Sequence, residues 1–574
     1  MDTGTRLKVD NLSVLFRHEG GTSVAVDGIS FGIGRGEIVG MVGESGSGKS
    51  VTAMSVLRLI PQPPALIRAE AVSLVTAAQE IRLDLQDEKT MQEVRGKAIS
   101  MIFQEPMTSL NPAFTCGMQV TEVLRRHLGM NRKEAETKAI SLFREVLLPR
   151  PEEILRAYPH QLSGGQKQRV MIAMAIACDP GLLIADEPTT ALDVSVQKTI
   201  LELIGSLQRS RGMSVLFITH DLALVRGFAH RVIVMYKGKI VEEGPVDQIF
   251  HDPAHPYTRA LIACRPDPDT RLRRLPTIGD LKGTGKEPGI SGNLVIPDQE
   301  REQRHRELYE RKPVVVVENL SKIYEAAGGP FSRKAKPYQA LRDICLQIYP
   351  GETLGIVGES GSGKTTLARV MIRLLPETAG RIWYQGQDIT LLTGRLLKQF
   401  RKEIQIVFQD PYSSLNPRMT AGNAIMEPMK VHGLYGGTSE RREKTIALLE
   451  QVGLQADHFH RYPHEFSGGQ RQRICIARGI AVDPDLIVLD EAVSALDVSV
   501  QAQVLNVLND LKKNYGLTYI FISHDLSVVK YMSDRVVVMN EGHIVETGEA
   551  DALYAHPVSE YTRMLLDATP KINR

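Results

Sequence analysis

Short apolar runs recur along the chain in a regular order, and each run ends at a glycine, an acid or a histidine. They form three pairs, which lie at 37–43 and 353–358, at 182–186 and 486–490, and at 214–220 and 518–524. Their brevity and their β-branched residues favour strands over helices, and continuous apolar runs are typical of parallel strands buried on both faces. Functional residues often lie at the carboxyl ends of such strands. The pattern therefore predicts parallel sheets with functional residues along one edge.

The pattern is duplicated, because long motifs of the first half return in the second. GESGSGKS at 43–50 returns as GESGSGKT at 358–365, and YPHQLSGGQKQR at 158–169 returns as YPHEFSGGQRQR at 462–473. A repeat of this length indicates a duplicated domain and not a solenoid unit.

A segment without hydrophobic periodicity separates the two copies. Proline, glycine and charge dominate residues 265–312 until a short charged stretch that can be helical, so we expect a linker with irregular structure. The predicted domains are then 1–264 and 313–574. The first copy also carries extra residues around Glu70–Arg95, which we interpret as a surface elaboration.

Composition restricts the function classes. Hydrophobic residues make up 43% of the 574 residues, and the net charge of +2 is too small to favour nucleic acid or an anionic membrane as the main partner. The separation of Cys116, Cys178, Cys264, Cys345 and Cys475 predicts small buried side chains in a reducing compartment. No signal peptide or spanning apolar stretch is found, so we expect a cytoplasmic chain that reaches a membrane only through partners.

Two loops of the form GxxxxGK[ST] follow predicted strands and precede helical stretches. Their glycines let backbone N–H groups face phosphate oxygens, and the next helix offers its positive end to the same anion. Lys49 and Lys364 are expected to reach the β- and γ-phosphates of ATP, and Ser50 and Thr365 to ligate Mg²⁺. One such loop could be a turn without a ligand, but two in the same context predict two ATP sites. The loop residues are Gly43, Glu44, Ser45, Gly46, Ser47, Gly48, Lys49 and Ser50, and Gly358, Glu359, Ser360, Gly361, Ser362, Gly363, Lys364 and Thr365.

An acidic pair closes one apolar run in each copy. Asp186 and Asp490 lie where an acid can hold Mg²⁺, and Glu187 and Glu491 follow where a carboxylate can orient the water that attacks the γ-phosphate. Alone, such a pair would more often be a solvated turn or a helix cap. The phosphate-binding loop upstream and the histidine downstream favour the catalytic interpretation.

The motif that singles out one family is LSGGQ at 162–166, with FSGGQ at 466–470. A serine and two glycines that open a helix can present N–H groups and a hydroxyl to phosphate, although SGGQ alone could be a helix cap. Together the motifs resemble the nucleotide-binding subunits of ABC transporters over nearly the whole chain outside the linker. The resemblance implies an α/β fold of two tandem P-loop NTPase cassettes, each with a mainly parallel core sheet, helices, an antiparallel β subdomain and a helical subdomain.

The resemblance also implies that the two cassettes pack head to tail and enclose two ATP molecules. One ATP would contact Lys49, Asp186, Glu187 and His220 of the first cassette and Ser467 and Gly469 of the second. The other would contact Lys364, Asp490, Glu491 and His524 of the second cassette and Ser163 and Gly165 of the first. The remaining signature residues expected at the nucleotides are Gly164, Gln166, Gly468 and Gln470.

Further positions match family residues one by one. Gln104 and Gln409 match the glutamine that senses Mg²⁺ and the attacking water, and His220 and His524 match the histidine that contacts the γ-phosphate. Phe16 and Tyr324 resemble the adenine-stacking aromatic, with a plain core aromatic as the alternative for each.

Departures from the family pattern are mild. Phe466 replaces the usual signature leucine, and Ala492 and Val493 replace the Pro-Thr found at 188–189. Neither change removes a phosphate ligand or an acid, so we expect two hydrolytic sites.

Three kinds of ABC protein fit a soluble pair of cassettes. A translation factor would carry a long basic hairpin between the cassettes, and a DNA-repair ATPase would carry zinc cysteines or coiled-coil insertions. QEPMTSLNP at 104–112, QDPYSSLNP at 409–417 and HDPAHPYTRALIA at 251–263 instead resemble the peptide/nickel importer branch, and AHPVSEYTRMLLDA at 555–568 is a looser copy of its tail. Only Cys264 lies near a tail, so we predict no iron–sulfur centre.

The fused arrangement is most similar to the ATPases of bacterial glutathione and oligopeptide importers. This resemblance implies an ATPase that energises import of peptides or related small solutes. The implied partners are two transmembrane permease subunits and a periplasmic or extracellular solute-binding protein, without nucleic acid. The implied location is the cytoplasmic face of the inner membrane, with membrane contact only through the permease.

Overall fold

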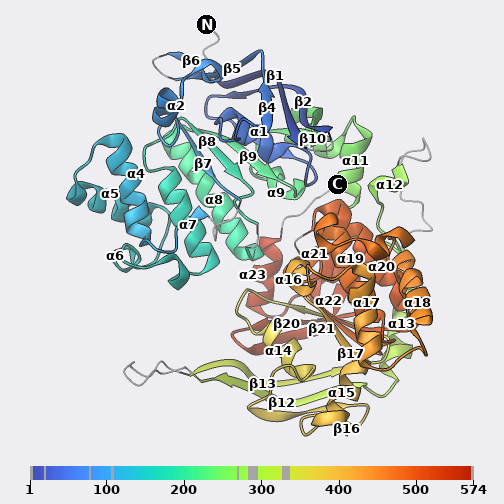
Figure 1. Cartoon of the computed structure of the whole chain (residues 1–574). Helices are drawn as coiled ribbons and strands as arrows, with labels where there is room; N and C mark the ends of the chain where they lie inside the picture. The colour runs from blue at the N-terminus through green and yellow to red at the C-terminus, as the bar shows by residue number, and fades with distance from the viewer. Residues whose placement is uncertain are drawn as a thin grey trace. The chain divides into compact units, whose positions relative to one another are not determined.

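The computed structural model describes residues 4–18, 21–76, 79–104, 109–190, 192–267, 270–281, 295–325, 337–494 and 496–569. The chain forms two compact units, one built mainly from residues up to Ile262 and the other mainly from Ala263 to Thr569 (Figure 1). Among the described residues, no helix has the uninterrupted apolar length that crossing a membrane requires.

The first unit contains two sheets. Its six-stranded sheet has the order β11-β10-β3-β9-β8-β7, in which only the pair of β10 and β11 is antiparallel. The strands are β3 (Ile38–Val42), β7 (Ile99–Ile102), β8 (Leu182–Asp186), β9 (Ser214–Thr219), β10 (Arg231–Tyr236) and β11 (Lys239–Pro245). An antiparallel sheet is built from β1 (Thr5–His18), β2 (Gly21–Gly34), β4 (Ala65–Arg68), β5 (Ala71–Val75) and β6 (Glu80–Arg82).

Helices of the first unit cover the sheets and form a separate helical part. The helices among the described residues are α1 (Lys49–Val56), α2 (Glu88–Val94), α4 (Cys116–Leu128), α5 (Arg132–Glu145), α6 (Pro151–Ile154), α7 (Gly164–Ala175), α8 (Val194–Arg211), α9 (Leu222–Arg226), α10 (Val246–His251) and α11 (Pro256–Ala263). In Figure 1, α4, α5 and α6 gather beside α7, away from the antiparallel sheet. Thr115 and Asn131 cap α4 and α5 with their side chains, which fixes where these helices begin.

The second unit repeats this plan. Its sheet has the order β17-β18-β19-β14-β20-β21 and consists of β14 (Thr353–Val357), β17 (Ile404–Val407), β18 (Leu486–Asp490), β19 (Thr518–Ile522), β20 (Arg535–Asn540) and β21 (His543–Glu549). The antiparallel sheet is β12 (Val315–Tyr324), β13 (Tyr338–Ile348), β15 (Ala379–Tyr384) and β16 (Gln387–Asp388). The helices are α12 (Ile278–Leu281), α13 (Asp298–Tyr309), α14 (Lys364–Met371), α15 (Gly394–Glu403), α16 (Pro411–Ser414), α17 (Ala421–Val431), α18 (Thr438–Gln451), α19 (Gly468–Ile480), α20 (Val498–Tyr515), α21 (Leu526–Met532), α22 (Ala550–Ala555) and α23 (Glu560–Ala568).

The predicted parallel strands are confirmed. Every residue of β3, β8 and β9 is buried, as is every residue of β14, β18 and β19. In the second unit, one face of the sheet packs with the antiparallel sheet and α14, and the other face packs with helices that include α19 and α20. The predicted α/β fold of two cassettes is therefore confirmed, and the predicted functional residues follow the carboxyl ends of these strands.

The interpretation of Glu70–Arg95 as a surface elaboration is wrong. The segment supplies β5, β6 and α2, and β5 pairs with β1 in the antiparallel sheet. Val72, Leu74, Leu83 and Met91 are buried in the core of the first unit. The apolar residues of this segment therefore complete the core and do not decorate the surface.

The linker packs on the second unit over part of its length. Leu272 and Leu275 are buried in the core of that unit. The Leu275 backbone N–H donates to Asn506 Oδ1 at 2.9 Å, and Asn506 Nδ2 donates to the Leu275 carbonyl at 2.8 Å. Asn506 is itself buried, so these two bonds satisfy a polar side chain that would otherwise be costly to bury. Residues 282–294 lie outside the described residues.

The expectation of buried cysteines holds for four of the five. Cys116, Cys178, Cys264 and Cys475 are buried, whereas Cys345 is exposed on β13. Alternate residues of a strand face opposite sides of a sheet, which leaves this cysteine on the open face.

Candidate functional site

The P-loop of each unit connects the central strand to the helix that follows. Gly48 has a φ of 103°, and a Cβ there would lie 2.6 Å from the Ala25 carbonyl oxygen, so the turn requires glycine. The Lys49 ammonium group is buried and donates to the carbonyl oxygens of Gly43 at 2.7 Å and Glu44 at 2.8 Å. The lysine is thus held across the loop that it closes.

The second P-loop has the same geometry. Gly363 has a φ of 105°, and a Cβ there would lie 2.7 Å from the Ala340 carbonyl oxygen. The Lys364 ammonium group donates to the carbonyl oxygens of Gly358 at 2.6 Å and Glu359 at 2.8 Å, and burial lowers its pKa. The other loop residues lie at the turns predicted for them, with Ser45, Gly46, Ser360 and Gly361 exposed.

A hydroxyl and a carboxylate meet beside each P-loop. Ser50 Oγ lies 3.0 Å from Asp186 Oδ1, and Thr365 Oγ1 lies 3.1 Å from Asp490 Oδ1. Burial raises the pKa of Asp186 to about 6 and also raises the pKa of Asp490. A buried carboxylate beside a hydroxyl is a set of hard oxygen ligands, which fits Mg²⁺.

The glutamate after each strand has a constrained backbone. Glu187 has a φ of 47°, which is left-handed and uncommon for a residue with a side chain, and its N–H donates to the Ile218 carbonyl at 2.9 Å. Glu491 has a φ of 51°, and its N–H donates to the Ile522 carbonyl at 2.9 Å. Backbone strain retained in both copies is typical of functional sites.

Three side chains converge on one oxygen of Glu187. Gln104 Nε2 donates to Glu187 Oε2 at 3.0 Å, Thr190 Oγ1 donates to it at 2.9 Å, and His220 Nδ1 lies 3.1 Å from it. Burial alone would raise the pKa of Glu187, but hydrogen bonds from His220 and Thr190 and the charge of Lys49 lower it to about 2. The carboxylate is therefore ionised at neutral pH.

The same arrangement surrounds Glu491. Gln409 Nε2 donates to Glu491 Oε2 at 2.7 Å, and His524 Nδ1 and Ser494 Oγ each lie 3.4 Å from that oxygen. Burial would raise the pKa of Glu491, but His524 and Lys364 lower it. Each unit therefore brings its predicted glutamine, glutamate and histidine together.

Sequence reasoning missed the hydroxyls of Thr190 and Ser494. They occupy matching places in the repeated motifs DEPTTALD and DEAVSALD, which is the signal that identifies them.

We expect Thr190→Val to lower kcat for ATP about threefold to tenfold without changing KM for ATP, because one hydrogen bond that orients Glu187 is lost. Steady-state phosphate release checks this, and a change confined to KM would contradict it.

The signature serines cap their own helices. Ser163 Oγ accepts the Gln166 N–H at 3.3 Å while Gln166 Oε1 accepts the Ser163 N–H at 3.0 Å, and Ser467 and Gln470 form the same capping box before α19. The helix-cap interpretation of SGGQ is thus correct as a description of local structure. A capped helix start still presents its positive end to an anion.

Close packing explains the glycine before the signature glutamine. A Cβ on Gly165 would lie 2.8 Å from Val196 Cγ1, and a Cβ on Gly469 would collide with Val500. Gly468 has open space around it, and Gly164 meets only Leu192 Cδ2, at 3.5 Å. One glycine therefore lets the helix pack, and the other leaves the start of the helix uncovered.

The two predicted adenine-stacking aromatics differ in their surroundings. Phe16 is half-buried and packs against the core of the first unit, as the core-aromatic alternative expects. Tyr324 is 38% exposed at the end of β12, with Lys322 Nζ 5.5 Å from its ring centroid. Tyr324 is therefore the freer of the two for stacking on a base.

The departures of the second unit affect packing only. Phe466 is buried against the edge of the His458 ring, with centroids 5.3 Å apart, and Ala492 and Val493 are buried in the core. None of these changes displaces Asp490 or Glu491 from the arrangement found in the first unit.

Comparisons with known proteins agree with this geometry. The family "ABC transporter" matches residues 26–190 and 341–494, and "Oligopeptide/dipeptide transporter, C-terminal region" matches residues 241–288 and 545–574. The glutathione import ATP-binding protein GsiA of Escherichia coli O6:H1 is 47% identical and aligns with 99% of this chain and 90% of its own length. The protein of the same name from Shigella flexneri is 46% identical over the same shares.

A solved dimeric ATP-binding cassette, MJ0796 bound to ADP and phosphate, is 28% identical over 41% of this chain and 98% of its own, with a TM-score of 0.37. The family match covers both P-loops and both acidic pairs, and the curated relatives align over nearly the full length. The chain belongs to the ABC transporter family, as an ATP-binding and ATP-hydrolysing protein with two cassettes.

Proposed function

We propose that the chain energises the import of glutathione or a related small peptide through an ABC importer. The observation that carries this proposal is the arrangement found in both cassettes, in which a glutamine and a histidine meet one carboxylate oxygen of a glutamate. An importer that hydrolyses ATP at two sites needs this set twice. The name of the relatives that are 47% identical and the match of both tails to a peptide-transporter region support the choice of solute.

The proposed chemistry depends on position and charge. Glu187 and Glu491 orient the attacking water and accept its proton, and Lys49 and Lys364 neutralise charge that develops on the transferred phosphoryl group. His220 and His524 would contact the γ-phosphate. Ser50, Gln104 and Asp186 would hold one Mg²⁺, and Thr365, Gln409 and Asp490 the other. The ion, when bound, offsets the charge of the phosphates.

The two nucleotide sites are proposed to be shared between the cassettes. Each P-loop would hold one ATP, and the signature of the other cassette would complete the site with Ser467 and Gly469 or with Ser163 and Gly165. The open space beside Gly468 supports this role, because a phosphate can approach the backbone there. ATP would close the cassettes and hydrolysis would reopen them.

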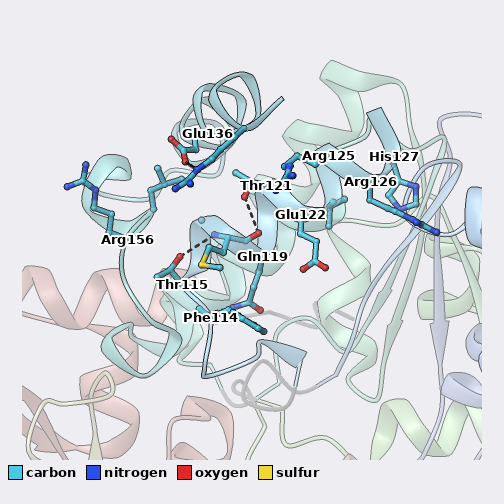
Figure 2. A pocket seen from close by; sticks show the side chains of 15 residues that line it. Phe114, Thr115, Gln119, Thr121, Glu122, Arg125, Arg126, His127, Glu136 and Arg156 are labelled. Carbon is cyan, nitrogen blue, oxygen red and sulfur yellow. Dashed lines mark hydrogen bonds and ion pairs between the residues drawn. The ribbon is translucent and has the colours of Figure 1, made fainter. Parts of the chain in front are cut away.

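The proposed partners are two permease subunits and a solute-binding protein outside the cytoplasm, with the chain peripheral on the cytoplasmic face of the inner membrane. An open groove of about 1330 Å³ in the helical part of the first cassette supports permease docking. Figure 2 shows Phe114 and Thr115 towards one end of α4 and Arg126 and His127 towards the other. Exposed Phe114 and Met118 offer apolar contact, and the arginines offer charge.

The loop beside this groove is held on α4. Gln119 Nε2 donates to the carbonyls of Asn111 at 3.1 Å and Phe114 at 3.2 Å, and the Asn111 N–H donates to Gln119 Oε1 at 2.9 Å. The motif at 104–112 that resembles the peptide/nickel importer branch ends in this loop, while its residues 105–108 lie outside the described residues. A permease segment in the groove would thus act on the loop that carries Gln104.

In the second cassette, the loop that follows Gln409 contacts the signature helix α19. Arg471 of α19 lies over the Tyr412 ring at 3.9 Å, and Arg478 donates to the Ser414 carbonyl at 2.5 Å. Both aromatic and carbonyl partners follow Gln409 closely. Movement of this loop would therefore displace the helix that begins at the SGGQ motif.

The domain division is also a proposal: cassettes at 1–264 and 313–574, joined by a linker at 265–312. The bonds between Leu275 and Asn506 support a linker that is fastened to the second cassette. This differs from the long basic hairpin that a translation factor would need.

Transport into proteoliposomes tests the proposed solute. The chain is purified with its membrane subunits, reconstituted with the solute-binding protein, and assayed for uptake of radiolabelled glutathione with ATP on the cassette side. We expect ATP-dependent uptake that unlabelled glutathione competes away. A radiolabelled dipeptide is assayed in parallel, and uptake of neither glutathione nor the dipeptide would refute the proposal. Recovery of the chain with ribosomes but without membrane subunits would support the translation-factor alternative.

A further inference from the structure

Each cassette ends in a short helix after its antiparallel strand pair, and a tyrosine lies in the first turn of that helix. Tyr257 is the second residue of α11 and Tyr561 is the second residue of α23, at matching places of the two copies. Neither residue belongs to the P-loop, the acidic pair or the signature. Their contacts nevertheless lead to the nucleotide site.

The first tail is fastened to the body of its cassette by charge. The two carboxylate oxygens of Glu242 accept the N–H groups of Ala254 at 2.7 Å and His255 at 3.1 Å. Arg259 Nε donates back to the Pro253 carbonyl at 2.9 Å, which closes the turn before the helix. These bonds fix the position from which Tyr257 projects.

The second tail uses the same device. The carboxylate oxygens of Glu546 accept the N–H groups of Val558 at 2.9 Å and Ser559 at 3.0 Å. Arg563 Nε donates to the Pro557 carbonyl at 3.0 Å. The two tails therefore present their tyrosines in the same way, although their sequences differ.

Both tyrosines contact the P-loop directly. The Glu44 N–H donates to Tyr257 Oη at 3.1 Å, and the Glu359 N–H donates to Tyr561 Oη at 3.0 Å. The carbonyl of the same Glu44 accepts the Lys49 ammonium group at 2.8 Å. Tyr257 thus holds the same residue, Glu44, that positions the phosphate-binding lysine. In the second cassette, Tyr561 holds Glu359, whose carbonyl accepts the Lys364 ammonium group.

The phenol rings are themselves held in place. Tyr257 is 5% exposed and stacks on Tyr236 with ring centroids 4.2 Å apart. Burial raises the pKa of Tyr561 to about 12, so its hydroxyl stays protonated at neutral pH. A fixed, neutral hydroxyl is suited to a lasting hydrogen bond with a backbone N–H.

We propose that Tyr257 and Tyr561 are positioning residues for ATP binding, each fixing the P-loop residue whose carbonyl holds the P-loop lysine. The tail region then shapes the nucleotide site from within each cassette. This role concerns affinity for ATP and is independent of the transported solute.

The test compares the full-length double variant Tyr257→Phe/Tyr561→Phe with the full-length wild-type chain. Because one hydrogen bond per site is removed and the ring is kept, we expect KM for ATP, and Kd for a fluorescent ATP analogue, to rise about threefold to tenfold. We expect kcat at saturating ATP to stay within about twofold, because no group that contacts the reacting phosphate changes.

The matched control is Tyr554→Phe, which also removes a tail hydroxyl, one that donates to the Leu526 carbonyl at 2.6 Å and not to the P-loop. We expect this control to leave KM and Kd unchanged. Unchanged KM and Kd in the double variant would overturn the proposal. An equal rise in the control, or a rise that only follows a lower melting temperature, would also overturn it. Failure of glutathione uptake would leave this comparison unaffected.

Discussion

ATP hydrolysis falls by at least about 100-fold in the double variant Glu187→Gln/Glu491→Gln, while ATP binding persists. Each glutamate receives a glutamine and a histidine on the same carboxylate oxygen, and each is ionised because hydrogen bonds and the P-loop lysine outweigh burial. An amide cannot accept the proton of the attacking water. Phosphate release at saturating ATP, together with equilibrium binding of a fluorescent ATP analogue, measures the two properties separately.

The single variants test whether both sites hydrolyse ATP. Each of Glu187→Gln and Glu491→Gln should lower activity strongly, because the two glutamates have equivalent surroundings. Near-normal turnover in one single variant would show that its site is degenerate. Glu88→Gln is the control, since Glu88 pairs with Arg95 at 2.5 Å on an exposed surface and should leave activity unchanged.

The second large effect is on stability, and we expect Asp534→Ala to destabilise the second cassette by about 3–5 kcal/mol. Asp534 is buried and accepts the Thr353 N–H at 2.8 Å, with Lys512 Nζ at 3.2 Å and Arg304 of the linker at 3.1 Å. Burial would raise the pKa of Asp534, but these charges, and a bond from His305, hold it well below its usual range. The variant leaves Lys512, whose side chain is only 14% exposed, without this counter-ion.

Fluorescence reports this effect selectively. Trp383 is the single tryptophan of the chain and lies in β15 of the second cassette, so its thermal transition follows that cassette. The control Asp510→Ala removes an exposed pair with Arg274 and should cost less than about 1 kcal/mol. A transition that is equal in the wild type and Asp534→Ala would contradict the role of this cluster.

The pH dependence of this difference has a defined sign. The pKa of an aspartate in the unfolded chain is about 3.9. A carboxylate whose pKa is lowered by folding stabilises the folded state above that value and loses the contribution as the pH falls below it. The gap between wild type and Asp534→Ala should therefore be full at pH 7 and shrink below about pH 4. A gap that grew on acidification would contradict the assignment.

Local motifs made much of the site predictable. The P-loops need glycine at Gly48 and Gly363 because neighbouring backbone leaves no room for a Cβ, and such demands appear in sequence as fixed spacing. The burial of β3 and β8 on both faces likewise appears as an apolar run. The acid that ends β8 and the histidine after β9 then follow from strand ends alone.

Contacts between distant residues were not predictable in this way. Tyr257 and Glu44 lie 213 residues apart, and nothing in HPYT indicates a partner in the P-loop. The pairing of Leu275 with Asn506 joins an apparently irregular linker to a buried helix. The prediction of a surface elaboration at 70–95 is wrong because β5 and α2 bury apolar residues in the core of the first unit, and the sequence repeat does not reveal the strands against which they pack.

The decisive measurement is a structure of the Glu187→Gln/Glu491→Gln variant with ATP and Mg²⁺ bound, because the proposed mechanism requires each cassette to contact both nucleotides. We predict that the γ-phosphate near Lys49 also contacts Ser467, and that the γ-phosphate near Lys364 also contacts Ser163. Nucleotides that touch residues of one cassette alone, or that join P-loops and signatures of two separate chains, would contradict the account.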